Sequence, residues 1–203
     1  RHIVKLMVEI ANPQFGDRVY DPTCGTGGFL IQAFNHIKRS CKTTSSNLKT
    51  LKEETVFGRE LIYTGSIAKM NMIITGDGHT NIIQMDSLEA PVKNHYDVVL
   101  ANPPYAQITD YGDLYPIHSI QADPIFLQHI MLSLNDNGKA AVIVPEGVLY
   151  RKGADKKVRE LLLTKYNLIA IISLPSESFV PYASAKTYIL MFQKGSQTKK
   201  VWF

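Results

Sequence analysis

The tetrapeptide Asn102-Pro103-Pro104-Tyr105 follows directly on a strand-like apolar run, "YDVVLA", at residues 96–101. The side-chain oxygen of Asn102 and the carbonyl oxygen of Pro103 are hydrogen-bond acceptors, and the fixed φ of proline holds the second acceptor in place. Pro104 biases Pro103 towards an extended conformation, and the ring of Tyr105 can stack on a planar group. Two preorganised acceptors beside an aromatic ring suit a reaction at a planar amino nitrogen. A rigid turn after a strand is the alternative interpretation.

A glycine-rich segment after an earlier strand is the second chemically informative stretch. It reads "DPTCGTGGF" and consists of Asp21, Pro22, Thr23, Cys24, Gly25, Thr26, Gly27, Gly28 and Phe29. Its spacing matches neither the dinucleotide pattern G-x-G-x-x-G nor a P-loop, which ends in Lys-Ser/Thr. An acid before the glycines repels a pyrophosphate and attracts a ligand with a positive amino group. We therefore expect such a ligand here, although a lone G-x-G can be a plain tight turn.

Two further acids close the next two strand-like segments, Glu60 in "TVFGREL" and Asp86 in "NIIQMDS". In nucleoside-binding α/β folds an acid such as Glu60 accepts hydrogen bonds from the ribose hydroxyls. Its distance from the glycines exceeds the usual spacing of about 20 residues, and the polar segment 40–54 would account for the excess. Asp86, with Ser87, can accept a hydrogen bond from an adenine amino group or can cap a turn. Together with Asp21 they predict a site for S-adenosylmethionine, which joins an amino acid end, a ribose and an adenine.

Alternating helix and strand patterns are expected to position these residues. Helical spacing of apolar residues predicts helices at 2–11, 27–39, 64–76, 122–135 and 154–166. Apolar runs predict strands at 17–22, 55–61, 81–87, 96–101, 138–146, 168–174 and 185–194. This α/β alternation indicates a mostly parallel sheet covered on both faces, with the last two strands as an antiparallel hairpin at one edge.

Local signals set the ends of several elements. Asp123 is expected to cap the helix at 122–135, with Pro124 in its first position. A Thr or Ser cap and Gly76 are expected to bound the helix at 64–76. The polar residues 41–54 predict a surface loop.

Composition limits the class of protein. With 203 residues, 45% of them hydrophobic and 20% charged, the chain suits one globular α/β domain. Its longest apolar runs are shorter than the roughly 20 residues of a membrane span, so we expect no membrane partner. The net charge of +4 permits contact with nucleic acid without demonstrating it. Cys24 and Cys41 lack a metal-binding spacing, so we expect no metal and reduced thiols in a cytosolic protein.

The two motifs together resemble those of amino-directed DNA methyltransferases, with "DPTCGTGGF" as cofactor motif and "NPPY" as catalytic motif. Their order, cofactor motif first, is similar to that of the N-6 adenine methylase family. The run "GKAAVIVPEGVLYRKGADKKVRELLL" and the later "LIAIISLPSESFVPYASAKTYILMFQKG" resemble the modification subunit of type I restriction–modification systems. The resemblance extends from Ile3 to about Lys194.

This resemblance implies a Rossmann-like class I methyltransferase fold with a seven-stranded sheet. It implies direct methyl transfer from S-adenosylmethionine to the N6 amino group of adenine in DNA, with no intermediate on a cysteine. Asn102 to Tyr105 would then be catalytic, Asn102 would also lie beside the cofactor, and Tyr105 would stack on a base that has left the duplex. The implied partners are DNA, a specificity subunit and a restriction subunit in a prokaryotic cytoplasm. Residues 1–203 would be the catalytic domain alone, without the family's N-terminal helical domain, its Thr-Pro element before Arg1 or its C-terminal helices.

Two assignments keep alternatives. Phe179 in "SESFVPYA" is a candidate for a second stacking ring, since the family carries an aromatic residue there, and it is equally suited to a hairpin core. A basic cluster, Lys152, Lys156, Lys157 and Arg159, can contact phosphates or form a solvated helix face.

Other functions remain open at this stage. The motif N-P-P-Y also suits methylation of a glutamine amide in a release factor, of a guanine amino group in RNA or of a cytosine amino group in DNA. A truncated core that only assembles with partners is the non-catalytic alternative. The segment from Gly138 onward favours adenine in DNA.

Overall fold

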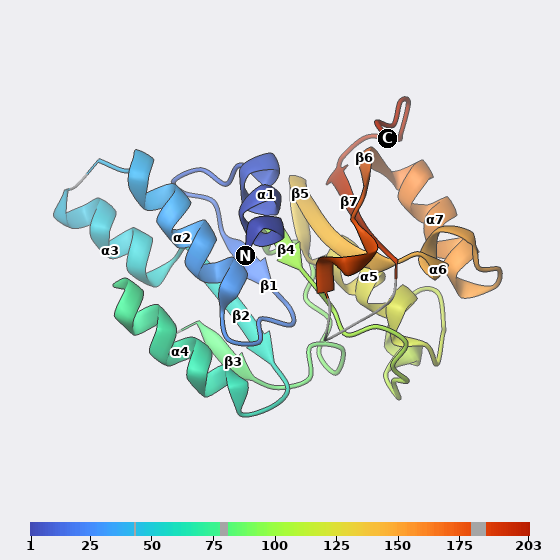
Figure 1. Ribbon diagram of the computed structural model, residues 1–203, viewed down its shortest axis with the longest axis horizontal. Helices are drawn as coiled ribbons and strands as arrows, with labels where there is room; N and C mark the ends of the chain where they lie inside the picture. The colour runs from blue at the N-terminus through green and yellow to red at the C-terminus, as the bar shows by residue number, and fades with distance from the viewer. Residues whose placement is uncertain (43, 78–80, 180–185) are drawn as a thin grey trace.

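The chain forms one seven-stranded sheet with helices on both faces in a computed structural model, which describes residues 1–42, 44–77, 81–179 and 186–203 (Figure 1). The strands are β1 (Val19–Asp21), β2 (Val56–Glu60), β3 (Ile82–Gln84), β4 (Tyr96–Ala101), β5 (Leu134–Pro145), β6 (Tyr166–Ser173) and β7 (Thr187–Lys194). The helices are α1 (His2–Ala11), α2 (Gly28–Ser40), α3 (Ser45–Glu53), α4 (Thr64–Thr75), α5 (Ala122–Ser133), α6 (Gly147–Tyr150) and α7 (Ala154–Lys165). Two 3-10 turns are η1 (Gly112–Leu114) and η2 (Ser176–Phe179).

The strand order β3-β2-β1-β4-β5-β7-β6 confirms the expected Rossmann-like sheet. The first five strands in this order pair in parallel, and β7 pairs antiparallel with both β5 and β6. The C-terminal antiparallel pair lies at one edge, as expected, with β7 inserted so that β6 is the edge strand. The connections from β1 and β4 diverge to opposite sides of the sheet. Ligands of open α/β sheets bind at such a switch point, beyond the carboxyl ends of the strands.

Two of the three hydrophobic clusters form layers, one on each face of the sheet. Side chains of α1, α2 and α4 form the layer on the first face, and side chains of α5 and α7 form the layer on the second. Strand β4 serves both layers, because Val98 and Leu100 belong to the first cluster while Val99 and Ala101 belong to the second. This two-sided burial explains why "YDVVLA" is apolar without alternation. No helix in the described part of the chain is long and apolar enough to cross a membrane.

Several local expectations were wrong. Residues 41–54 contain the helix α3, which Thr44 caps by accepting a hydrogen bond from the Asn47 backbone N–H at 3.2 Å. This helix buries little besides Leu51, so its sequence carries almost no apolar stripe to predict it from. Helix α4 begins after Tyr63 without a side-chain cap, although Gly76 ends it as expected. Strand β5 begins at Leu134 rather than at residue 138, because α5 ends two residues earlier than expected.

Candidate active site

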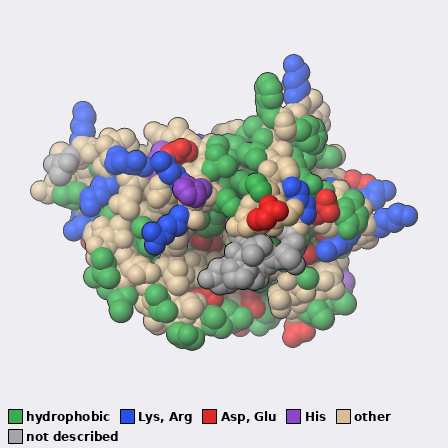
Figure 2. Space-filling model, viewed as in Figure 1, with side chains coloured by type: hydrophobic (Ala, Val, Ile, Leu, Met, Phe, Trp, Pro, Cys, Tyr) green, Lys and Arg blue, Asp and Glu red, His purple; other side chains and the backbone are tan. Residues whose placement is uncertain are grey.

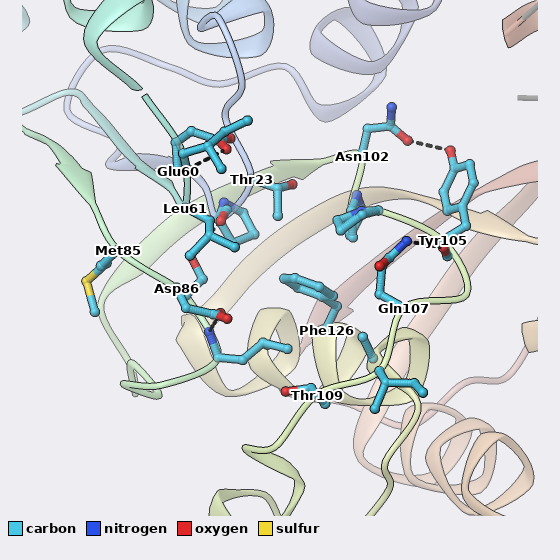
Figure 3. Close-up of a pocket in the computed structure, with 18 residues that line it drawn as sticks. Thr23, Glu60, Leu61, Met85, Asp86, Asn102, Tyr105, Gln107, Thr109 and Phe126 are labelled. Atoms are coloured by element: carbon cyan, nitrogen blue, oxygen red, sulfur yellow. Dashed lines mark hydrogen bonds between the residues drawn. The ribbon is translucent and has the colours of Figure 1, made fainter. Parts of the chain in front are cut away.

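A cavity of about 830 Å³ lies beyond the carboxyl ends of β2, β3 and β4 (Figure 3). Its volume falls within the range of small-molecule sites. Nine of the residues singled out in the sequence line it: Pro22, Thr23, Glu60, Asp86, Ser87, Asn102, Pro103, Pro104 and Tyr105. Figure 3 shows Glu60 and Asp86 on one side of the cavity and Asn102 and Tyr105 on the other, with Phe126 between them. The two motifs, about 80 residues apart in the chain, therefore meet at one site.

The carboxylate of Glu60 has two structural contacts in addition to facing the cavity. Its Oε2 accepts a hydrogen bond from the Gly25 backbone N–H at 2.8 Å, and its Oε1 accepts one from the Ile62 N–H at 3.3 Å. Glu60 therefore links the end of β2 to the glycine loop. Asp86 accepts a hydrogen bond from the Leu88 N–H at 2.8 Å, so it closes a local turn while it lines the cavity.

The glycine loop takes a left-handed conformation at Gly25 and Gly27, where φ is 53° and 86°. Residues that carry a side chain rarely adopt these angles, so both positions favour glycine. Cys24 turns inward and is buried in the first core cluster, where burial raises the pKa of its thiol. Phe29 is buried in the same cluster, and Thr26 accepts a hydrogen bond from Asn71 through its backbone carbonyl. These three residues support the loop from behind and do not line the cavity.

Asp21 also lies behind the loop, with 1% of its surface exposed. Its Oδ1 accepts a hydrogen bond from the Thr23 backbone N–H at 3.0 Å. Burial raises the pKa of this carboxyl to about 7, and the negative charge of Glu60 adds to the shift. The Asp21 carboxyl is therefore expected to gain or lose its proton near neutral pH.

Asn102 and Tyr105 contact each other in this structure. The Tyr105 hydroxyl donates a hydrogen bond to Asn102 Oδ1, as the dashed line in Figure 3 marks. Burial raises the pKa of the Tyr105 phenol, so the hydroxyl stays protonated and remains a donor. The Asn102 oxygen has two lone pairs, so it can accept a hydrogen bond from a planar amino group in addition to the one from this hydroxyl.

A buried hydrogen-bond chain supports the wall of the cavity next to Asp86. The Tyr115 hydroxyl donates to the Leu88 carbonyl at 3.1 Å, and it also lies 3.0 Å from His129 Nδ1. Because a carbonyl only accepts, His129 Nδ1 must donate to Tyr115, and Nε2 must accept from the Tyr20 hydroxyl at 3.1 Å. Burial lowers the pKa of His129 to about 3, consistent with a neutral ring. The hydrogen bonds of this network therefore all donate in one direction, from the Tyr20 hydroxyl towards the Leu88 carbonyl.

Replacing His129 by phenylalanine is expected to lower the free energy of unfolding by about 2 kcal/mol near pH 7.5, because buried polar groups lose their partners. The native ring has a pKa of about 3 and the unfolded ring an ordinary one of 6.5. The contribution of the neutral His129 ring to the free energy of unfolding is therefore fully present above pH 6.5 and is lost as the pH falls towards 3. The difference between the two proteins should shrink over this range in urea unfolding, with the exposed His118→Gln as the control. A difference that grows towards acid pH would contradict this assignment.

Sequence reasoning missed several residues of the cavity. Phe126 is buried on α5, and Gln107, Ile108 and Thr109 come from the loop after the N-P-P-Y motif. The position of these loop residues directly after the motif could have indicated that they line the cavity. Phe126 had no such signal, because it lies in a helix that is buried on nearly every side.

The remaining predicted site residues lie elsewhere. Phe179 ends η2, and its side chain lies outside the described residues, so a stacking role stays a prediction. Lys152, Lys156 and Lys157 are exposed near the start of α7, where Figure 2 shows basic side chains at the right-hand edge. Arg159 does not belong to this exposed group, since it donates to the backbone carbonyls of Val148 and Arg151. Across the described residues, no cluster of His, Cys, Asp and Glu is arranged to hold a metal ion.

Comparisons with known proteins extend over the whole chain. The model of the family described as N-6 DNA Methylase matches residues 1–203. The EcoEI type I restriction enzyme methylase subunit of Escherichia coli is 34% identical over 211 residues, which cover 100% of this chain and 43% of that protein. A chain from a structural study of complex assembly and conformational transition in a type I R-M system superposes with a TM-score of 0.93 at 34% identity, covering 99% of this chain and 43% of that one.

A more distant structure shares the fold alone. A class I S-adenosylmethionine-dependent methyltransferase from Listeria monocytogenes gives a TM-score of 0.77 at 19% identity, covering 99% of this chain and 62% of that chain. The present chain spans less than half the length of the EcoEI subunit.

Proposed function

Because this chain belongs to the N-6 DNA methylase family, we propose that it transfers a methyl group from S-adenosylmethionine to the N6 amino group of adenine in DNA. The observation that carries the proposal is a single cavity that has Glu60 and Asp86 on one side and Asn102 and Tyr105 on the other. Such a cavity can hold a nucleoside cofactor against a planar amino group. The arrangement at the switch point of the sheet is the one expected for a ligand of this fold.

The residues at the cavity fit S-adenosylmethionine. The side chain of Thr23 lines the cavity beside the glycine loop, where its hydroxyl can contact a ligand. A side chain at Gly25 would meet open space, so a ligand can approach the backbone there. Glu60 would accept hydrogen bonds from the ribose hydroxyls, Asp86 and Ser87 would bind the adenine, and Asp21 would attract the amino group. When bound, the cofactor supplies an electrophilic methyl group on its sulfonium.

The N-P-P-Y residues then prepare the acceptor nitrogen. The lone pair of an adenine amino group is delocalised into the ring, which makes the nitrogen a poor nucleophile. Hydrogen bonds from its two N–H groups to Asn102 Oδ1 and the Pro103 carbonyl would draw the nitrogen out of the ring plane and localise the lone pair. The rigid backbone at Pro103 and Pro104 avoids reorganisation during the reaction. Tyr105 would stack on the extruded base, worth roughly 1–3 kcal/mol.

We further propose that the chain is the catalytic domain of a modification subunit in a type I restriction–modification system. The EcoEI relative, a type I methylase subunit, is more than twice as long as the matched region. Sequence specificity would come from a specificity subunit, and cleavage from a restriction subunit, in a prokaryotic cytoplasm. The exposed Lys152, Lys156 and Lys157 are available to DNA phosphates, although a solvated helix face is the simpler explanation of their exposure.

Labelled methyl transfer tests the proposal. The full-length protein, purified with its specificity subunit, would be given S-adenosylmethionine labelled in the methyl group and offered genomic DNA, RNA or a release factor. We expect label in DNA, recovered as N6-methyladenine after digestion to nucleosides. Label in cytosine, in RNA guanine or in a protein glutamine would assign the site to another planar nitrogen. Absence of both transfer and cofactor binding would favour the non-catalytic alternative.

A further inference from the structure

Asp123 does not have the role that its position suggested. Helix α5 begins after Gln121, so Asp123 is its second residue and does not cap it. Its carboxylate, 2% exposed, points instead to two other segments. Oδ1 accepts a hydrogen bond from the Ala106 backbone N–H at 3.0 Å, and Oδ2 accepts one from Arg151 Nη1 at 2.9 Å. The expectation of a capping residue failed because these partners are 17 and 28 residues away in the sequence.

Ala106 is the residue at which the chain leaves the N-P-P-Y motif. Its φ of 54° is left-handed, which is uncommon for a residue with a side chain and must be held by its surroundings. The bond to Asp123 provides that restraint. The next backbone contacts extend it, because the Ala122 N–H donates to the Gln107 carbonyl at 2.9 Å. The exit of the motif is therefore attached to the first turn of α5.

Arg151 is itself fixed in place. A Cβ atom at Gly147 would lie 2.3 Å from Arg151 Nε, so the guanidinium lies directly against the start of α6. Arg159 donates to the Arg151 carbonyl at 2.9 Å and to the Val148 carbonyl at 2.7 Å, which holds the turn from which Arg151 extends. A buried carboxylate is costly unless it is paired and hydrogen-bonded. Asp123 meets both conditions through partners that connect α6 to the motif.

We propose that Asp123 and Arg151 are positioning residues for methyl transfer, an inference that rests on the proposed function. Neither lies at the acceptor nitrogen. They fix the backbone at Ala106, one residue beyond Tyr105, and thereby set the direction of the Tyr105 ring and the Asn102 oxygen. The Tyr105–Asn102 hydrogen bond carries this restraint to both groups.

Steady-state kinetics of the full-length protein with its specificity subunit test the inference. Asp123→Asn and Arg151→Gln should each lower kcat on the order of 10- to 100-fold, because small misplacements of reacting groups have effects of this size. The KM for S-adenosylmethionine should change less than about 3-fold, since the cofactor wall across the cavity is untouched. The kcat of the double variant should be no lower than that of the less active single variant. Arg151→Lys, which keeps a charged donor, should retain most of the wild-type kcat.

The matched controls remove the same charges away from the site. Asp136→Asn replaces an aspartate with a 92% exposed side chain at the start of β5, and Arg39→Gln replaces an arginine at the end of α2. Neither should change kcat. If Asp123→Asn and Arg151→Gln keep the wild-type kcat, or if kcat and cofactor KM deteriorate together, the inference is wrong.

Hydrogen exchange gives a readout that does not depend on activity. Asp123→Ala removes the acceptor of the Ala106 N–H, so exchange should accelerate in a peptide that covers residues 103–110. Arg151→Gln, whose parent side chain is 40% exposed and tolerates replacement, should accelerate the same peptide to a smaller extent. Unchanged exchange, or acceleration spread evenly over the protein, overturns the inference. If the wild type methylates no adenine, the proposed function fails while this exchange result still decides the role of Asp123.

Discussion

Asn102→Ala is expected to lower the rate of methyl transfer about 10³-fold, the scale seen when one preorganised hydrogen-bonding group is removed from an active site. The substitution removes the acceptor oxygen that would withdraw the amino nitrogen from the ring plane. Glu60 and Asp86 lie across the cavity and are unaffected, so the affinity for S-adenosylmethionine should change only a few-fold. Single-turnover methylation and calorimetric titration with the cofactor measure the two quantities separately.

Two companion variants distinguish the role of the Asn102 oxygen as an acceptor for the substrate from the role of its hydrogen bond with Tyr105. Asn102→Asp keeps an oxygen that can accept from both the substrate and the Tyr105 hydroxyl, so it should retain more activity than Asn102→Ala. Tyr105→Phe keeps the stacking ring and removes the hydroxyl that now occupies the Asn102 oxygen, so it should lose far less than Asn102→Ala. Full activity in Asn102→Ala would refute the mechanism. Equal losses in Asn102→Ala and Tyr105→Phe would instead indicate that the Tyr105–Asn102 hydrogen bond, and not an acceptor for the substrate, is what Asn102 provides.

The parts of the site that the sequence predicted are those encoded locally. The run before Asn102 is apolar on both faces because β4 is central, and the prolines end it at the carboxyl edge of the sheet. Asp21, Glu60 and Asp86 follow the same logic, since each ends a strand or follows it closely. Parallel strands bring such ends to one edge whatever their separation in sequence.

What the sequence did not predict depends on partners far along the chain. Asp123 resembles a helix cap in its local context, and only its bonds to Ala106 and Arg151 reveal another role. His129 lies in a helix whose residues are almost all buried, so its position on one face carries no signal. The inward position of Asp21 is also a property of the folded loop, because the sequence predicted a carboxylate that faces the ligand and the structure buries it behind the loop. Long-range hydrogen bonds of this kind leave no periodic trace in the sequence.

The affinity for S-adenosylmethionine is expected to fall up to 10-fold per pH unit as the pH is lowered from about 7 towards 5. Asp21 has a pKa of about 7 in the free protein, so at lower pH its carboxyl carries a proton. The positive amino group of the cofactor favours the carboxylate, and binding below pH 7 must therefore release that proton. The cofactor amino group, with an ordinary pKa near 8, stays charged throughout this range. Protonation of Asp21 then determines the direction of the effect, which is weaker binding of the cofactor at acid pH.

Calorimetry in two buffers with different ionisation enthalpies measures both the affinity and the protons released. The wild type should release close to one proton per cofactor at pH 6, and the net release should vanish towards pH 8, where the cofactor amino group begins to take up a proton on binding. Asp21→Asn, which cannot ionise, should bind about 10- to 100-fold more weakly at pH 8, about 1.4 to 2.7 kcal/mol, with no proton release at either pH. Asp136→Asn, exposed at the start of β5, should behave as the wild type does. Equal wild-type affinities at pH 5.5 and 7.5 would show that the amino group binds elsewhere, and that the buried carboxyl of Asp21 only shapes the glycine loop through the Thr23 N–H.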